Sequence, residues 1–178
     1  EMRTYYLQPK EYYIFCISKK DMDCFKAAGA DESKLLLSAN GANHKRFTYH
    51  KEAVLPDRSV YLAQINERKK QWIYQEIDSI DYVGRIMGGT PFDPKKNYLG
   101  EWKDDYKREH LGDFANLVLL SDGENGTPLV VKEAMILGLG VVISKYAAHD
   151  LPELPYVTVI PVSYTHLSCR RNRRCSSR

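Results

Sequence analysis

The sequence SDGENGTPLVVKEAM, Ser121 to Met135, joins a glycine-containing turn to the start of an apolar helix pattern. The run before it, Phe114–Leu120 (FANLVLL), is almost continuously apolar, as is typical of a strand buried on both faces of a parallel sheet. After the turn, Pro128–Leu137 is expected to be a helix, with Thr127 as its N-cap and Gly138 at its end. The pattern therefore predicts a strand, a turn and a helix in succession.

This turn is a candidate ligand site, because loops at the carboxyl ends of parallel strands are where α/β folds bind ligands. The amides and positive dipole end of the helix favour a phosphate, and Gly126 lets the backbone approach it closely. Glu133 lies about a turn and a half into the helix, where it can accept hydrogen bonds from ribose hydroxyls. Many α/β folds contain such a unit, and Glu133 would then be a surface residue paired with Lys132 or with solvent.

Apolar runs rich in β-formers alternate with amphipathic segments on both sides of this unit, which indicates an α/β fold with a parallel sheet. The expected strands are Tyr12–Ile17, Ser59–Ile65, Asp81–Ile86, Asn97–Trp102, Phe114–Leu120, Val141–Ser144 and Tyr156–Pro161, with Leu35–Leu37 as a further short apolar run. The expected helices are Lys20–Ala28, Glu67–Asp78, Asp104–Leu111 and Pro128–Leu137. The polar connection that contains Pro56 is the predicted boundary between two domains.

The charge distribution argues against a nucleic-acid partner. The 178 residues have a formal net charge of +3, but five of the 26 basic residues are arginines beyond Val162, where no acidic residue occurs. The remaining 21 basic residues face 23 acidic ones, which gives the body of the chain a net charge of −2. No apolar run approaches the roughly 20 residues that a membrane span requires.

Both ends of the sequence suggest a piece of a longer protein. VSYTHL, Val162–Leu167, resembles the translated read-through of a sequencing adapter, and the alternative is a disordered basic C-terminus. The chain starts at Glu1 without a basic and then apolar leader, so this start is expected to be internal. Cys16 and Cys24 lack the paired spacing of a zinc site, and no metal is expected.

Ser121–Gly138 resembles the donor-site signature of retaining GT-B glycosyltransferases, roughly S-x-x-E-G-F-x-L-x-x-x-E-A-M-x-x-G followed by a strand. Asn125–Ser144 (NGTPLVVKEAMILGLGVVIS) contains the matching Gly, Leu, Glu-Ala-Met, Gly and strand in order. Ser38–Phe47 (SANGANHKRF) resembles the crossover N-G-V-D-x-x-x-F between the two domains of that family. Tyr61–Gln71 (YLAQINERKKQ) resembles the first strand and loop of the second domain. NYLGEW, the helix after it and FANLVLLSDGE resemble the run before the donor motif, so the resemblance covers the chain from about Tyr12 to Pro161.

The fold that this resemblance implies is α/β, a Rossmann-like parallel sheet with flanking helices. It would be the C-terminal half of a GT-B fold, incomplete at both ends. Residues 1–37 would be a remnant of the N-terminal acceptor domain, and residues 38–58 the interdomain crossover. Residues 59–161 would be the truncated nucleotide-sugar-binding domain, and residues 162–178 a non-native or disordered tail.

The resemblance also assigns site residues. Lys69 stands in place of the family's phosphate-binding lysine, with Arg68 beside it as a second cation. Gln64 stands where an arginine normally helps to hold the diphosphate, and Glu133 matches the second of the family's paired glutamates. The backbone at the helix start is expected to contact the donor, through Gly126, Thr127, Pro128 and Leu129.

Two residues are candidates for the position of the carboxylate that contacts the sugar. Seven residues separate the family's paired glutamates, whereas eight separate Glu124 from Glu133. Counting back from Glu133 places Asn125 in the first-glutamate position, so that either Asn125 replaces the carboxylate or a one-residue bulge lets Glu124 reach the sugar. Glu124 is favoured, because loops absorb an extra residue easily. The expected catalytic residues are therefore Glu124 and Lys69.

The resemblance implies transfer of a hexosyl group from a UDP- or GDP-linked sugar to an acceptor hydroxyl, with retention and without a metal or other cofactor. The acceptor would be a saccharide or a lipid-linked glycan of polysaccharide biosynthesis. The enzyme would be cytoplasmic, at the inner face of the membrane if the missing domain binds there, and inactive as this fragment. One alternative is a non-catalytic nucleotide-binding Rossmann-like module, which would keep Lys69 and the helix amides. A nucleic-acid binder resting on the basic tail is a further alternative.

Overall fold

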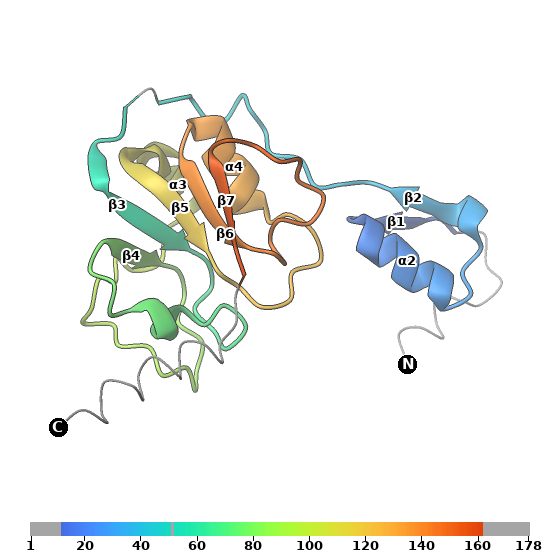
Figure 1. Ribbon diagram of the computed structural model, residues 1–178, viewed down its shortest axis with the longest axis horizontal. Helices are drawn as coiled ribbons and strands as arrows, with labels where there is room; N and C mark the ends of the chain where they lie inside the picture. Colours follow the sequence, from blue (N-terminus) through green and yellow to red (C-terminus); the bar gives the residue numbers. More distant parts are fainter. Residues whose placement is uncertain (1–11, 51, 162–178) are drawn as a thin grey trace.

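The computed structural model describes residues 12–50 and 52–161, so the predictions for residues 1–11 and 162–178 lie outside the described residues. The first part of the fold is a small βαβ unit (Figure 1). Strands β1 (Ile14–Cys16) and β2 (Leu35–Leu37) pair in parallel, and helix α2 (Lys19–Ala27) connects them. The Ser18 hydroxyl accepts a hydrogen bond of 3.0 Å from the Asp21 amide and so caps the start of α2.

The second part is a five-stranded parallel sheet with the order β4-β3-β5-β6-β7. Its strands are β3 (Leu55–Leu62), β4 (Ile80–Val83), β5 (Phe114–Leu119), β6 (Gly140–Ser144) and β7 (Val157–Ile160). The helices α3 (Asp104–His110) and α4 (Leu129–Leu137) accompany the sheet, and α4 packs against β5 and β6 (Figure 1). Short 3-10 turns occur at Glu32–Lys34, Gln71–Tyr74 and Leu111–Asp113.

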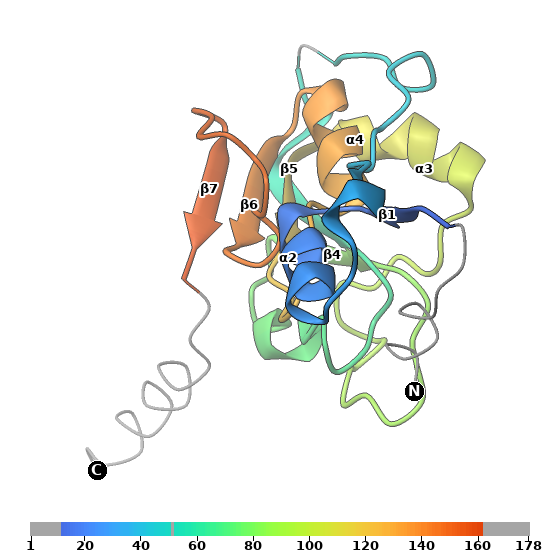
Figure 2. The same cartoon turned by 90° about the vertical axis from the view of Figure 1, so that its right-hand side faces the viewer.

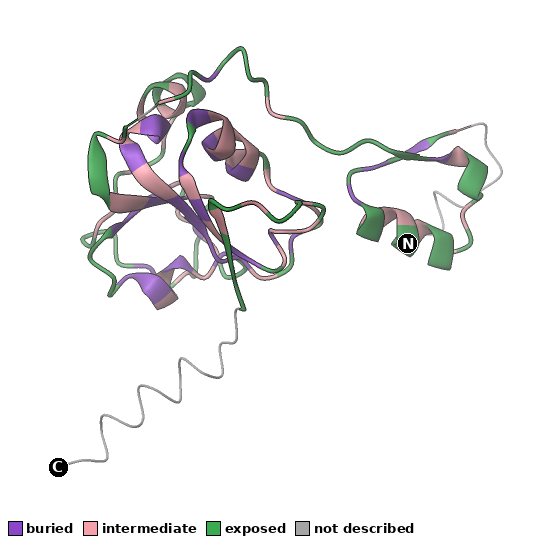
Figure 3. Cartoon of the chain, turned by 45° about the horizontal axis from the view of Figure 1, so that its top comes forward, coloured by how far each residue is buried: buried purple, intermediate pink, exposed green. Residues whose placement is uncertain are grey.

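The main hydrophobic core lies along the sheet, where Figure 3 shows most of the buried segments. Tyr61, Leu117 and Leu119 are completely buried, as expected for strands covered on both faces. The βαβ unit has a separate small core formed by Ile14, Cys16 and Leu35. The α/β class, a Rossmann-like parallel sheet with flanking helices, is confirmed.

Two predicted elements are wrong. Glu67–Asp78 was expected to be a helix, but it contains only the 3-10 turn Gln71–Tyr74. Lys70 adopts a left-handed conformation with φ 51° and ψ 33°, which a continuous helix does not allow. The amides of Lys69 and Lys70 instead bond the carbonyl of Asn66 at 3.1 and 3.0 Å, which closes a tight loop after β3.

Asn97–Trp102 is the second wrong prediction, because it forms only an isolated bridge between Tyr82 and Tyr98 instead of a strand. Asn97 and Gly100 have positive φ values of 50° and 85°, which interrupt an extended conformation.

Strand β3 starts at Leu55 and so includes Pro56 and the residues before the predicted start at Ser59. The register with β5 shifts between Leu55 and Ser59, an irregularity at which a proline without an amide hydrogen is tolerated.

The connection between the two parts, residues 38–50, contains no helix or strand, and Figures 1 and 2 show the βαβ unit at its far end. The Lys132 ammonium donates a hydrogen bond to the Asn40 carbonyl in this connection. The Lys19 amide donates to the Asp150 carboxylate across 3.4 Å, so the start of α2 also contacts the loop after β6. Within the described residues, no helix combines the length and the apolar composition needed to cross a bilayer.

Candidate functional site

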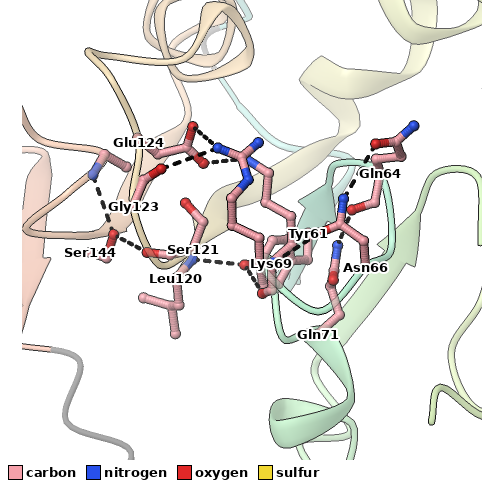
Figure 4. Close-up of polar contacts among 12 residues, drawn as sticks. Tyr61, Gln64, Asn66, Lys69, Gln71, Leu120, Ser121, Gly123, Glu124 and Ser144 are labelled. Carbon is pink, nitrogen blue, oxygen red and sulfur yellow. Dashed lines mark hydrogen bonds and ion pairs between the residues drawn. The ribbon is translucent and has the colours of Figure 1, made fainter. Parts of the chain in front are cut away.

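The candidate site lies at the carboxyl ends of β3 and β5, which are neighbours in the sheet (Figure 4). The loop after β3 contains Lys69, and the loop after β5 contains Glu124. Tyr61 joins the two loops, because its buried hydroxyl donates to the Lys69 carbonyl at 2.7 Å and accepts from the Leu120 amide at 3.0 Å. Packing of the sheet therefore brings together two loops that are distant in sequence.

A buried ion pair forms the centre of this site. The Lys69 ammonium contacts the Glu124 carboxylate, and the two residues are only 8% and 7% exposed. The Arg68 guanidinium approaches the other Glu124 oxygen at 3.3 Å and donates to the Gly123 carbonyl at 3.2 Å. One carboxylate thus accepts from two cations, as Figure 4 shows.

Further bonds fix the two loops to each other. The Asp122 amide donates to the Arg68 carbonyl at 2.9 Å, and the Lys70 ammonium pairs with the Asp122 carboxylate at 3.0 Å. The Ser144 hydroxyl donates to the Ser121 carbonyl at 2.7 Å and so ties the end of β6 to the same loop. These contacts hold the cations and the carboxylate in a defined arrangement.

Burial and charge shift both members of the pair. Burial lowers the pKa of Lys69, although the hydrogen bond and the charge of Glu124 act in the opposite direction. Burial alone would raise the pKa of Glu124, but hydrogen bonds from Lys69 and Ser121 and the charges of Lys69 and Arg68 outweigh it, so the pKa lies below its usual value. The contact from Ser121 is weak, because this buried hydroxyl has no partner of good hydrogen-bond geometry within the described residues.

Gln64 lies on the same edge but outside the ion cluster. Its exposed side chain accepts a hydrogen bond of 3.3 Å from the Asn66 amide group, and its backbone carbonyl accepts one of 3.0 Å from Gln71 (Figure 4). Gln64 is neutral at the position where the resemblance has an arginine, and the cations that contact Glu124 are Lys69 and Arg68.

The start of α4 differs by one residue from the prediction. Pro128 is the N-cap, with φ −61° and ψ 148°, and the helix begins at Leu129. Thr127 is not the N-cap, because its hydroxyl donates to the His149 carbonyl in the loop after β6. The amides of Thr127, Leu129 and Val130 have no acceptor within residues 12–50 and 52–161, so they remain able to bind an anion.

Gly126 brings this loop against the βαβ unit. Its φ is 138°, and a Cβ atom there would lie 3.3 Å from the Ser18 Cβ and 3.5 Å from the Ile17 carbonyl oxygen. A side chain would therefore be strained and would press on Ser18, the N-cap of α2. Asn125, the other candidate for the first-glutamate position, is exposed next to the buried Glu124.

Glu133 lies on α4 and has a partner that the sequence did not indicate. Both of its carboxylate oxygens are 2.9 Å from the ammonium of Lys107 on α3, whereas Lys132 bonds to the connection instead. Sequence reasoning missed Lys107 and Tyr61, because the partners of a charged helix residue and of a buried hydroxyl depend on packing. The only signal was the high charge of the segment Asp104–Leu111.

A cavity of about 440 Å³ lies elsewhere, between the connection and α3. Its lining residues are Arg46, Thr48, His50, Asp105, Arg108 and Glu109. None of the predicted site residues lines this cavity. We therefore place the candidate site at the strand ends, where a buried ion cluster and the helix amides occur together.

No protein-family model and no curated protein matches the chain. Several solved structures do match it, among them six at 12 to 14% sequence identity. HepE of Anabaena in complex with UDP has a TM-score of 0.69 at 14% identity, over 92% of this chain and 53% of that one. HepE with UDP-glucose gives 0.66 at 14% identity, over 92% and 54%. The lipopolysaccharide outer core galactosyltransferase WaaB gives 0.56 at 13% identity, over 90% and 52%.

At these identities the likeness establishes the fold. The chain has the Rossmann-like architecture found in a lipopolysaccharide galactosyltransferase and in HepE, and it spans about half the length of those two chains.

Proposed function

We propose that this chain is the donor-binding part of a glycosyltransferase that binds a nucleotide-diphosphate sugar. In the complete enzyme, the sugar would pass to an acceptor hydroxyl with retention. The observation that carries the proposal is the cluster of Lys69, Arg68 and Glu124 at the carboxyl ends of parallel strands, where α/β folds bind ligands. The complexes of HepE with UDP and with UDP-glucose support a donor of this class.

Each part of the site has a role in this proposal. Lys69, Arg68 and the amides at the start of α4 stabilise the diphosphate, which gains negative charge as it leaves the sugar. Glu124 accepts hydrogen bonds from sugar hydroxyls, and the exposed Asn125 next to it in the loop after β5 also contacts the donor. Glu133 accepts hydrogen bonds from the ribose, and Gln64 offers a neutral amide to the diphosphate.

Diphosphate binding and sugar recognition are coupled through Glu124. Because Lys69 and Arg68 both contact the Glu124 carboxylate, a diphosphate that binds these cations competes with Glu124. The displaced carboxylate would then be available for the sugar hydroxyls. Occupation of the phosphate site thus prepares the sugar site.

The finer assignments belong to the same proposal. The donor is a UDP- or GDP-linked hexose, the acceptor is a saccharide or lipid-linked glycan, and neither a metal nor another cofactor takes part. The reaction takes place in the cytoplasm, at the membrane if the acceptor is lipid-linked. This chain alone is expected to transfer sugar weakly or not at all, since it spans about half of the HepE and WaaB chains.

Calorimetric titration of the 178-residue chain with UDP, GDP, ADP and UDP-glucose tests the donor site. We expect UDP or GDP to bind in the presence of EDTA, and the sugar conjugate to bind more tightly than the diphosphate alone. Absence of binding by every diphosphate to a folded sample would refute the proposal. If UDP-glucose binds no more tightly than UDP, the result would favour a non-catalytic nucleotide-binding module.

Two variants of the ion cluster sharpen this test. Lys69→Met is expected to weaken UDP binding by about 10- to 100-fold, the value of a hydrogen bond to a charged group. Glu124→Gln is expected to bind UDP at least as tightly as the wild type. It should lose the higher affinity for UDP-glucose over UDP. Lys96→Met, which removes a surface lysine paired with Glu76, is the matched control and should bind like the wild type.

A further inference from the structure

We propose that Lys107 is a positioning residue that holds Glu133 for recognition of the vicinal diol of a ribose. This inference rests on the proposed function, because it assigns a second residue to the nucleoside end of the same site. The role of Lys107 is indirect, since its ammonium contacts Glu133 and the ligand would contact the Glu133 carboxylate.

The contact between the two residues is symmetrical and largely shielded from solvent. The Lys107 ammonium lies 2.9 Å from each oxygen of Glu133. The side chain of Lys107 is 18% exposed and that of Glu133 is 12% exposed. A pair that is shielded to this degree is screened less than a surface pair, so it restricts the carboxylate to one orientation.

Lys107 itself is held from two other sides. The Asp104 carboxylate approaches its ammonium at 3.2 Å, and the Phe47 ring lies 5.7 Å from the ammonium. Arg46 in turn pairs with Asp104, so the connection, α3 and α4 all contribute to the position of Lys107. A lysine fixed in this way can impose its geometry on Glu133.

This geometry leaves acceptor capacity on both oxygens of Glu133. An ionised carboxylate has about four lone-pair positions, and a single ammonium equidistant from the two oxygens uses one on each. The remaining positions lie on separate oxygens of one rigid group. Such a pair of acceptors suits two neighbouring hydroxyl donors, as in the 2′- and 3′-hydroxyls of a ribonucleotide.

The same contacts would also occur if the Lys107–Glu133 ion pair only stabilised the packing of α3 against α4 and had no role in binding. The two roles predict different effects of mutation. Loss of a purely stabilising ion pair would change stability and would affect every ligand to the same extent. Loss of a positioning residue would affect only ligands that carry the ribose diol. Comparison of UDP with 2′-deoxy-UDP and inorganic pyrophosphate therefore separates the two roles.

The test titrates these three ligands into the wild type and into Lys107→Met, Lys107→Arg and Glu133→Gln. Lys107→Met is expected to weaken UDP binding by about tenfold, to change pyrophosphate binding by less than about twofold, and to reduce the preference for UDP over 2′-deoxy-UDP. Lys107→Arg should recover most of the loss, because a guanidinium also donates to both oxygens. Lys103→Met, an exposed lysine at the N-cap of the same helix, is the matched control and should bind like the wild type.

Lys107→Met leaves the Glu133 carboxylate without its cation, and this unpaired charge can prevent folding. The double variant Lys107→Met/Glu133→Gln removes both charges and covers that case. It should bind UDP like Glu133→Gln alone, since Lys107 acts through Glu133. Unchanged UDP binding by Lys107→Met, or an equal loss for UDP and pyrophosphate, overturns the inference but not the proposed function. Failure of the wild type to bind either UDP or pyrophosphate overturns both.

Discussion

Lys69 and Glu124 are separated by 55 positions in the sequence, yet their charged groups are in contact below the surface. Removal of two charges from water is costly, and only close contact and further hydrogen bonds offset that cost. Arg68 supplies one of these bonds, and Tyr61 holds the Lys69 backbone in place. At the scale of single residues, the candidate site is therefore a preorganised cluster of charges, and in the proposed function a ligand's phosphate and hydroxyl groups take the place of its internal partners.

The pH dependence of stability should reveal the Glu124 ion pair. The pKa of Glu124 is lowered in the folded chain, so its ionised form stabilises the fold above the ordinary glutamate pKa of about 4.3. That stabilisation is lost as the pH falls through the lower folded value. Glu124→Gln should therefore lower the free energy of unfolding by about 1 to 3 kcal/mol near neutral pH, and by less at about pH 3.

Urea unfolding of the wild type and Glu124→Gln at both pH values measures this difference. Glu101→Gln, which changes an exposed glutamate, should show no difference at either pH. If the free energy of unfolding differs between the wild type and Glu124→Gln by the same amount at both pH values, the ionised carboxylate has no stabilising role.

At the scale of elements, α4 is the part of the fold that follows most directly from the sequence. Its apolar pattern and the glycine after it predicted the helix, and Gly138 does end it with φ 92°. The Leu139 amide bonds back to the Ala134 carbonyl at 3.0 Å, and the His50 amide bonds to the last helical carbonyl, that of Leu137, at 2.9 Å. The end of α4 is thus also an attachment point for the connection.

Gly138→Ala tests this helix end. The substitution would place a Cβ atom at positive φ, 2.5 Å from a ring carbon of Tyr49 and 3.0 Å from the His50 carbonyl oxygen. We expect a loss of about 1 to 3 kcal/mol in the free energy of unfolding, measured by urea denaturation. Gly88→Ala is the control, because no atom lies within 4 Å of that position and its φ is not positive, and its stability should stay close to that of the wild type. Equal stabilities of the two variants would refute this account of the helix end.

The elements that were predicted wrongly show where local pattern stops being informative. Glu67–Asp78 has apolar residues at helical spacing, but the amides of Lys69 and Lys70 both donate to the Asn66 carbonyl and form a turn. The buried Tyr61 hydroxyl then holds that turn at the end of the sheet. The bonds to Asn66 are local, whereas the Tyr61 hydroxyl also bonds the Leu120 amide and so ties the loop with Lys69 to the end of β5.

At the scale of the whole molecule, the charge of the chain is unevenly distributed. Residues up to Pro161 have a net charge of −2, whereas the segment 162–178, which lies outside the described residues, has five arginines and no acid. We expect a variant without residues 162–178 to bind UDP like the full chain and to show no affinity for DNA or RNA in fluorescence anisotropy at physiological salt. Nucleic-acid binding that persists in this variant would show that the body of the chain has a basic surface that the net charge does not indicate.

The sequence by itself determined the α/β class, most of the strands and helices, and the positions of Lys69 and Glu124 after apolar strands. These properties depend on hydrophobic periodicity and turn residues, which act over short distances along the chain. Only the tertiary structure decided the strand order β4-β3-β5-β6-β7, the pairing of Lys69 with Glu124 and the pairing of Lys107 with Glu133. The reason is physical: each of these contacts joins distant segments, and packing of the sheet and its helices selects one partner among many chemically equivalent charges.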